Sequence, residues 1–335
     1  MQRNLNRRDL LKTAGLASAG LALSPFLSRA WAAESVAGPK KKVLFFTKSQ
    51  GFQHSAITRK NADTLAFAEQ WLTDVGAAHG FEVTCTKDGS VFTPENLKQY
   101  DVIAFYTTLD LTKDSDKYGE KKDENGKRVT DKDHLLWKEP GMGEAGKAAF
   151  LDAIKNGKGF IGFHSAADTF HSKVHGKGEM LRSTDEAGKD AFDPYISMMG
   201  GEFIVHGAQQ KAILKTIDPK FPGADAFNNM SFQEEWYSLK NFAPDLHVIL
   251  AQDCTGMKGP MYARGMYPET WARMHGEGRV FYTSMGHREE VWKMPEFQNL
   301  VLGALKWTTR QVDVDVTPNV QTATPEADVK AVAKS

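Results

Sequence analysis

Residues 159–169 read Gly-Phe-Ile-Gly-Phe-His-Ser-Ala-Ala-Asp-Thr, and this stretch decides the fold. Its first five residues are an apolar run with the length of a buried strand, as is typical of parallel sheets covered by helices on both faces. The run passes directly into a tight turn in which small residues flank His164. This spacing is that of a nucleophile elbow, a strand-to-helix turn that holds one side chain above the sheet edge. The stretch predicts an α/β fold with His164 at the carboxyl edge of the sheet.

The sequence on both sides of the elbow supports the same fold class. We expect strands at residues 43–47, 81–86, 101–106, 211–217, 246–251, 270–274 and 279–283. We expect helices at residues 55–78, 144–156 and 295–307. This order indicates a flavodoxin-like, three-layer α/β domain over residues 43–310, with a mainly parallel sheet and helices on both of its faces.

The composition is that of an ordinary soluble globular protein. The 335 residues carry 42 Lys plus Arg against 42 Asp plus Glu, so the formal net charge is zero. No basic stripe lies beyond the first 30 residues, so nucleic acid is not expected as a partner. We expect no nucleotide cofactor. Cys85 and Cys254 are expected to be two separate buried thiols, with a disulfide in an oxidising compartment as the alternative.

The first 32 residues have the three parts of an export signal. Asn6-Arg7-Arg8-Asp9-Leu10-Leu11-Lys12 is a twin-arginine signature, an apolar stretch covers residues 13–27, and Ala30-Trp31-Ala32 is a cleavage signal. The apolar stretch is shorter than the roughly 20 residues that span a bilayer, although an uncleaved tether remains the alternative. We therefore predict export by the twin-arginine (Tat) machinery, a linker at residues 33–42 and a periplasmic or secreted mature protein.

Two segments depart from the globular pattern. Residues 107–143 are charged and polar, and Asn125-Gly126 is a hairpin turn signal. We expect this insertion to be a solvated surface excursion, with a lid over the site as the alternative. Residues 311–335 lack aromatic residues and carry Pro, Thr, Ala and alternating charge, so we expect a disordered tail.

The chain resembles the ThuA-like (trehalose utilisation) family from about residue 43 to 308. Five motifs carry the likeness in order: Gly51-Phe52-Gln53-His54, Gly162-Phe163-His164-Ser165-Ala166-Ala167-Asp168-Thr169, Gly200-Gly201-Glu202-Phe203-Ile204-Val205-His206, Glu234-Glu235-Trp236-Tyr237 and Gly278-Arg279-Val280-Phe281-Tyr282-Thr283-Ser284-Met285-Gly286-His287. The resemblance implies a fold similar to that of class I glutamine amidotransferases. It also implies a link to the breakdown of disaccharides and other glycosides, in some cases through 3-keto sugars.

Two features limit what the resemblance implies. Class I glutamine amidotransferases present a cysteine at the elbow, whereas this chain presents His164, which excludes glutamine hydrolysis through a thioester at this position. The charged insertion at residues 107–143 and the pair His171 and His175 do not belong to the family pattern. Substrate choice is therefore not carried over from the family.

Histidines follow several of the predicted strands. His54, His164 and His287 each come after a strand, and ligands of parallel α/β sheets bind beyond the carboxyl ends of the strands. His206 and Glu235, in two other motifs, are the natural remaining members of this cluster. Imidazoles with a carboxylate suit a divalent metal such as zinc, and they also suit acid–base chemistry near neutral pH. The spacing does not separate these roles: all five are candidate catalytic residues, and His54, His164, His206 and Glu235 are the candidate metal ligands.

Further residues are candidates for sugar binding. Asp168, one turn past the elbow, could orient a histidine, bond a sugar hydroxyl or cap a helix. Arg288 follows His287 directly and is a second polar candidate. The aromatic candidates for a platform on which sugar rings stack are Trp236, Tyr237, Tyr262, Tyr267 and Trp271. Core packing is the alternative for these aromatic residues.

Two functions fit these observations. The first is an enzyme acting on a glycoside or 3-keto-glycoside, in which a ketone at C3 acidifies the C2 proton. A metal or an imidazolium would stabilise the enolate, a His or Glu would remove the proton, and the C1 group would leave. The second is a non-catalytic periplasmic protein that binds carbohydrate or assists another protein. Both predict a small carbohydrate ligand, and both are compatible with a homo-oligomer.

Overall fold

The computed structural model describes residues 39–172 and 181–327 of the chain. The predicted export signal, residues 33–38 of the predicted linker and His175 lie outside the described residues. Within the described ranges no helix has both the length and the apolar character needed to cross a membrane.

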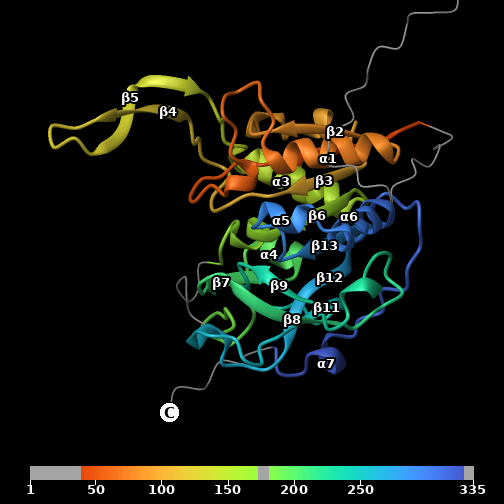
Figure 1. The fold of residues 1–335 in the computed structure, drawn as a ribbon. Coiled ribbons are helices and arrows are strands. Elements are labelled where there is room, and N and C mark those ends of the chain that lie inside the picture. Colours follow the sequence, from red (N-terminus) through yellow and green to blue (C-terminus); the bar gives the residue numbers. More distant parts are fainter. Residues whose placement is uncertain (1–38, 173–180, 328–335) are drawn as a thin grey trace, which may run out of the picture. The chain divides into compact units, whose positions relative to one another are not determined.

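Nine strands form one large sheet, and helices cover both of its faces, so the predicted α/β class is confirmed (Figure 1). In spatial order the strands are β2 (Phe81–Thr86), β1 (Lys41–Phe46), β3 (Val102–Phe105), β6 (Gly159–Phe163), β13 (Gly278–Thr283), β12 (Tyr267–His275), β11 (His247–Asp253), β8 (Gln210–Thr216) and β9 (Ser231–Glu234). From β2 to β13 the neighbours are parallel, and from β13 to β9 they are antiparallel. The sheet is therefore mixed, with its parallel half around the elbow.

The antiparallel pairing of β12 with β13 follows from the length of the connection between them. Only Gly276 and Glu277 join β12 to β13, and Gly276 has the positive φ of 59° that a tight hairpin turn requires. A parallel neighbour would need a crossover of a dozen or more residues. The parallel arrangement therefore ends at β13, and it comprises β2, β1, β3, β6 and β13.

Aromatic side chains hold the helices against the two faces of the parallel half. On one face Phe105 of β3 stacks on Phe150 of α3 (Gly143–Lys155), with ring centroids 4.7 Å apart. On the other face the ring of Phe163 of β6 packs against that of Trp292 of α5 (Glu289–Trp292), with ring centroids 5.2 Å apart. The remaining helices are α1 (Phe67–Ala78), α2 (Pro94–Leu97), α4 (Pro194–Met199), α6 (Pro295–Thr308) and α7 (Val320–Ala323). Both faces of the elbow strand are thus closed, which leaves its carboxyl end as the place for a ligand.

The helix expected at residues 55–78 is shorter than predicted. A single 3-10 turn covers Ser55–Ile57, and α1 begins only at Phe67. Between them Asn61 Oδ1 accepts hydrogen bonds from the backbone N–H groups of Asp63 and Thr64. Such local side-chain bonds offer the backbone an alternative to the helix, which explains the interruption.

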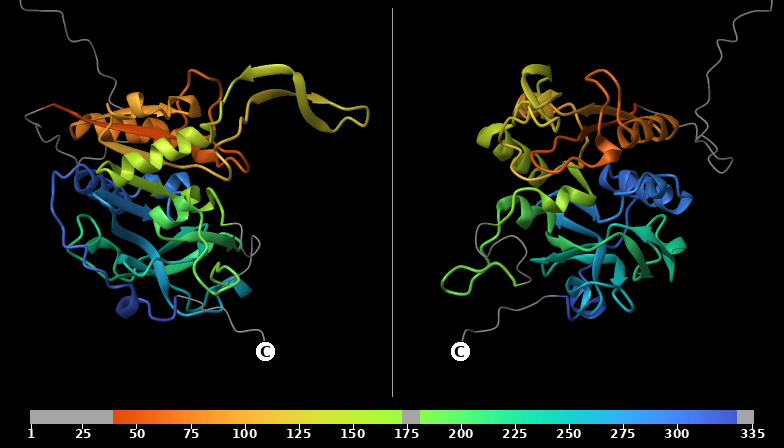
Figure 2. Two further views of the ribbon diagram at one scale, coloured as in Figure 1. Left: turned by 180° about the vertical axis from the view of Figure 1, so that it is seen from behind. Right: turned by 60° about the vertical axis from the view of Figure 1, so that its left-hand side comes forward.

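The insertion at residues 107–143 contains a two-stranded hairpin of β4 (Lys117–Lys122) and β5 (Arg128–Trp137). Its turn includes Gly126 with φ of 75°, in agreement with the predicted hairpin signal. The hairpin, yellow in Figure 2, projects away from the main sheet, and most of its side chains are exposed. These features agree with a solvated excursion rather than a lid.

Disorder was the wrong expectation for residues 311–327. Asn319 receives a hydrogen bond from the backbone N–H of Val248 at 2.6 Å and donates to its carbonyl oxygen at 3.1 Å. Arg279 donates to the carbonyl oxygen of Val312 at 3.0 Å. The segment therefore docks on β11 and β13 through hydrogen bonds, which its lack of aromatic residues does not reveal. Residues 328–335 lie outside the described part.

A second two-stranded sheet of β7 (Glu202–His206) and β10 (Tyr237–Lys240) was not predicted. Cys85 is half-buried and Cys254 is buried, and both thiols are free, as expected.

Candidate functional site

Four of the five predicted cluster residues meet at the carboxyl edge of the sheet. His54 follows β1, His164 follows β6, His287 follows β13 and Glu235 follows β9. The ring centroid of His54 lies 4.8 Å from that of His164 and 5.1 Å from that of His287. One potential ligand atom from each of the four residues lies within 4.8 Å of the others. Strands that end at one edge thus bring together side chains far apart in the sequence.

The elbow fixes the ring of His164. His164 has a φ of 42°, the left-handed conformation expected of the apex of such a turn. Its side chain is fully buried, and its Nδ1 lies 2.7 Å from the carbonyl oxygen of Ser284. A carbonyl oxygen can only accept, so Nδ1 carries the ring proton. The other nitrogen, Nε2, lies 3.3 Å from Glu235 Oε2.

Burial favours the neutral form of the His164 and His54 rings. It lowers the pKa of His164 to about 3 and also lowers the pKa of His54, although the hydrogen bond to Glu235 acts in the opposite direction. Burial alone would raise the pKa of the Glu235 carboxyl, but the surrounding histidine nitrogens hold it below its usual value. At neutral pH the lone pair of His164 Nε2 therefore faces a carboxylate oxygen. A cation between the two atoms would remove that repulsion.

His287 is oriented by two polar neighbours. Arg288 Nη1 donates to Gln209 Oε1 at 2.6 Å, so the Gln209 amide nitrogen is the group that faces His287 Nε2, at 2.8 Å. His287 Nε2 must then accept, which leaves the ring proton on Nδ1. That nitrogen lies 3.0 Å from Glu235 Oε2. Arg288, a predicted sugar-binding residue, thus acts in this structure by fixing the tautomer of His287.

Glu234 supports the cluster from behind, a role that the sequence analysis missed. One of its carboxylate oxygens accepts from the backbone N–H of Glu235 at 2.7 Å. The other accepts from the N–H groups of Gly286 at 3.3 Å and Arg288 at 3.4 Å, on either side of His287. Burial raises the pKa of the Glu234 carboxyl to about 7. The Glu-Glu pair in the fourth motif is the only sequence signal for this role.

His206 does not belong to the four-residue group, which corrects the predicted ligand set. Its side chain is 42% exposed, and its Nδ1 lies 3.3 Å from Glu235 Oε1, the oxygen that faces away from the other histidines. His206 ends β7, which pairs with β10 outside the large sheet, and so it approaches the cluster from the rim. His287 takes the place in the group that the sequence analysis gave to His206.

Asp168 orients a histidine, but not one of the cluster. Its Oδ1 lies 2.6 Å from His171 Nε2, and His171 Nδ1 lies 3.0 Å from Glu202 Oε1. Although burial lowers the pKa of His171, the two carboxylates prevail and raise it to about 9. His171 is therefore an imidazolium paired with two carboxylates, which leaves it unsuited to hold a metal.

The predicted aromatic platform is buried, so core packing is the correct alternative. The five aromatic side chains are at most 3% exposed: Trp236, Tyr237, Tyr262, Tyr267 and Trp271. Trp236 donates its Nε1–H to the carbonyl oxygen of Gln210 at 2.8 Å. The ring of Tyr237 packs against that of His164, with centroids 4.1 Å apart. Neither Trp236 nor Tyr237 offers a face on which a sugar ring could stack.

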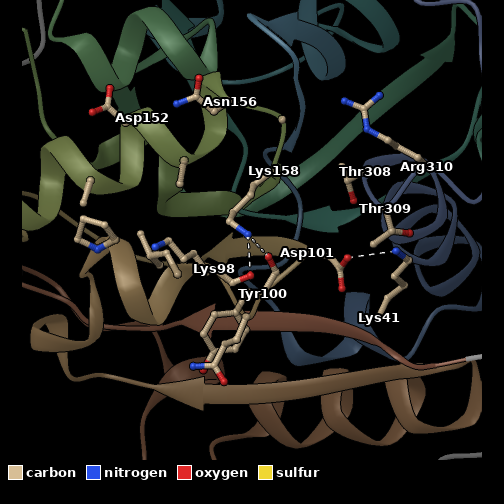
Figure 3. Close-up of a pocket in the computed structure, with 16 residues that line it drawn as sticks. Lys41, Lys98, Tyr100, Asp101, Asp152, Asn156, Lys158, Thr308, Thr309 and Arg310 are labelled. Carbon is tan, nitrogen blue, oxygen red and sulfur yellow. Dashed lines mark hydrogen bonds and ion pairs between the residues drawn. The ribbon is translucent and has the colours of Figure 1, made fainter.

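A cavity of about 610 Å³ lies at the opposite, amino-terminal edge of the parallel strands (Figure 3). Two of its basic side chains have partners: Lys41 pairs with Asp101 at 3.1 Å, and Lys158 donates to the carbonyl oxygens of Lys98 and Tyr100. Cations that bind carbonyl groups beyond a helix carboxyl end are a common stabilising device. None of the predicted site residues lines this cavity, so it is not the predicted site.

A mixed α/β sheet with a histidine elbow and a polar cluster beyond its parallel strands is consistent with the class I glutamine amidotransferase-like fold, with a histidine in place of the nucleophilic cysteine. The chain belongs to the ThuA family, described as trehalose utilisation, whose model matches residues 42–308. This membership confirms the resemblance and associates the chain with carbohydrate utilisation.

Two solved structures share the fold. A putative ThuA-like protein from Bacteroides uniformis matches with a TM-score of 0.53 and 19% identity, over 82% of this chain and 94% of that chain. A putative ThuA-like protein from Parabacteroides merdae matches with a TM-score of 0.50 and 18% identity, over 88% of this chain and 100% of that chain. No curated protein matches the chain.

Proposed function

We propose that this protein is a metal-dependent enzyme that acts on a glycoside or 3-keto-glycoside. The observation that carries the proposal is the close approach of the neutral His164 Nε2 to the Glu235 carboxylate at 3.3 Å. Two histidines and a glutamate form a common donor set of catalytic zinc sites, in which a further position stays open for substrate. His54 Nε2, His164 Nε2 and Glu235 Oε2 would be the ligands.

The separations between these atoms support that ligand set. Ligands that bind zinc at about 2.0–2.2 Å in a tetrahedron lie about 3.4 Å from one another. Glu235 Oε2 lies 3.3 Å from His164 Nε2 and 3.9 Å from His54 Nε2. The hydrogen bond from His164 Nδ1 to Ser284 orients the ring as the outer partners of metal-bound histidines do.

The remaining histidines can move the protons of the reaction. When bound, a divalent metal would stabilise negative charge on the substrate's 3-keto oxygen. His206 Nδ1 lies 3.0 Å from the carbonyl oxygen of Gly207, so its proton is there and Nε2 is free to accept the C2 proton. The C2–H electrons then form the C1–C2 double bond as the C1–O bond breaks. His287 Nδ1–H gives its proton to the departing oxygen, which yields an alcohol and an unsaturated 3-keto sugar.

Replacing His287 by Gln is expected to separate catalysis from metal binding. The variant should keep the metal content of the wild type, because the three proposed ligands remain. Its turnover should fall about 10²–10⁴-fold, because the general acid is lost. Metal is measured by elemental analysis, and turnover by the release of glucose from 3-keto-trehalose. His134→Gln, an exposed histidine on β5, is the matched control and should change neither quantity.

Two results would contradict the enzyme proposal. Equal turnover after removal of all metal would exclude the metal's role. A wild-type protein that binds the sugar but neither retains metal nor releases glucose would instead favour the non-catalytic carbohydrate-binding function.

We also propose export by the Tat route to the periplasm, on the strength of the twin-arginine signature. Changing Arg7 and Arg8 together to Lys should leave the precursor in the cytoplasm, because the Tat machinery reads this arginine pair. The measurement is cell fractionation with an immunoblot that separates precursor from mature chain. Normal delivery of the double variant to the periplasm would refute the proposed route.

A further inference from the structure

Phe52 is the most exposed large apolar side chain in the described part of the protein. Its ring is 70% exposed, compared with 47% for Leu136 and 42% for Leu135, both on the projecting hairpin. A single exposed apolar side chain needs no explanation by itself. The position of this one does need an explanation, because it lies two residues before His54.

The ring of Phe52 borders the polar cluster. Its centroid lies 5.0 Å from that of His54, and the two rings are nearly perpendicular, at 87°. His54 is itself buried and contacts His164 and His287. An open aromatic ring thus stands directly beside the buried histidines, where a substrate bound at the cluster would pass.

The backbone that carries Phe52 is held in place. Thr108, in the loop after β3, donates its hydroxyl to the Phe52 carbonyl oxygen at 3.2 Å, and its Oγ1 accepts from the Gly51 N–H at 3.2 Å. The Gln50 N–H donates to the Thr108 carbonyl oxygen at 3.1 Å. A Cβ on Gly51 would lie 2.6 Å from Leu109 Cδ1, so the two loops are in close contact. The exposed ring is therefore presented by a fixed support.

Leu109, which contacts Gly51, also lines a cavity. It measures about 650 Å³ and is lined by Leu109 and Phe170, with Asp110, Glu144 and His171 among its polar groups. Leu109 and Phe170 both have positive φ values, 57° and 52°, and conformations of this kind concentrate at ligand sites. The volume of the cavity falls within the range of about 300–1,000 Å³ that is typical of small-molecule sites. A ligand longer than one sugar ring would thus find space beside the Phe52 loop.

We propose that the exposed face of Phe52 is the surface on which the reacting sugar ring stacks while its C1–C3 edge lies at the histidine cluster. This inference rests on the proposed function and names the residue that recognises its substrate. The faces of aromatic rings carry partial negative charge, which attracts the weakly positive C–H groups of a pyranose. The aromatic residues that the sequence predicts for this role are buried.

The test is the kinetics of Phe52→Ala on 3-keto-trehalose. KM should rise about tenfold, as expected for the loss of one aromatic contact, while kcat changes less than twofold. Phe52→Tyr keeps the ring and should restore the wild-type KM. Metal content should stay at the wild-type value in both variants, because neither removes a proposed ligand.

Leu136→Ala is the matched control, since it removes a comparably exposed apolar side chain from the hairpin and should leave KM unchanged. An unchanged KM in Phe52→Ala, with normal turnover by the wild type, would overturn this inference and leave the proposed function standing. A KM that rises equally in Phe52→Ala and Phe52→Tyr would also overturn it, because stacking requires only the ring. Absence of turnover by the wild type would instead remove the proposed function, and the inference with it.

Discussion

Glu235→Gln is expected to lose both metal and turnover. Glu235 is the anion that the ring nitrogens of His54, His164 and His287 surround, at 3.9, 3.3 and 3.0 Å. Glutamine has nearly the same shape but no charge, so it leaves two neutral imidazoles to hold a divalent cation. Loss of an outer partner of a metal ligand already costs about 10–100-fold in affinity or activity, so loss of this ligand should exceed about 100-fold in metal affinity.

Metal affinity is measured by titration with a competing chelator, and turnover with 3-keto-trehalose. Glu69→Gln is the control: Glu69 is also a buried carboxylate, but it pairs with Arg59 at 2.8 Å and lies outside the cluster. This control should lower stability without changing the metal affinity of the folded protein. Retention of wild-type metal affinity by Glu235→Gln would show that the cluster is not a metal site.

Truncation after Arg310 is expected to destabilise the protein, contrary to the prediction of a disordered tail. The deletion removes both Asn319 hydrogen bonds to Val248 and the bond from His247 Nδ1 to the Thr317 carbonyl oxygen at 2.7 Å. It also exposes the amino end of β11. At about 0.5–1.5 kcal/mol for each hydrogen bond, the loss should be about 3 kcal/mol. At about 2.1 cal/mol/K of unfolding entropy per residue, that corresponds to a fall of about 5 °C in melting temperature for a domain of this size.

Thermal unfolding compares this truncation with one after Ala327, which keeps every contact described above. Ala327 is 2% exposed, and its carbonyl oxygen accepts from Arg264 at 2.7 Å. The chain that ends at Ala327 should therefore have the same melting temperature as the full chain. Equal melting temperatures for the full chain and the chain ending at Arg310 would show that the docked segment adds no stability.

The sequence by itself determined the features that depend on local pattern. The apolar run before His164 specifies a buried strand, because a strand covered on both faces buries every one of its side chains. The small residues around His164 specify the elbow, because a tight turn has no room for larger side chains. The position of His54, His164 and His287 after strands placed them at one edge, since parallel strands share their carboxyl ends. The Asn125-Gly126 turn signal likewise predicted the hairpin, because its chemistry lies within a few residues.

Only the tertiary structure decided features that depend on contacts between distant segments. His206 and His287 look equivalent in the sequence, but β7 pairs with β10 outside the large sheet and carries His206 to the rim. The side chains of Trp236 and Phe52 could each stack on a sugar ring. Trp236, however, is buried in the core, where its N–H has a hydrogen-bond partner, whereas Phe52 stays exposed.

The carboxyl-terminal segment, residues 311–327, is a further feature that depends on contacts with distant parts of the chain. Its composition predicts disorder, because composition measures how much apolar surface a segment can bury by itself. Asn319 instead binds the backbone of β11, a strand more than 60 residues earlier in the chain. Long-range pairing of this kind depends on where the rest of the fold leaves backbone groups unpaired, and no local pattern in the segment records that.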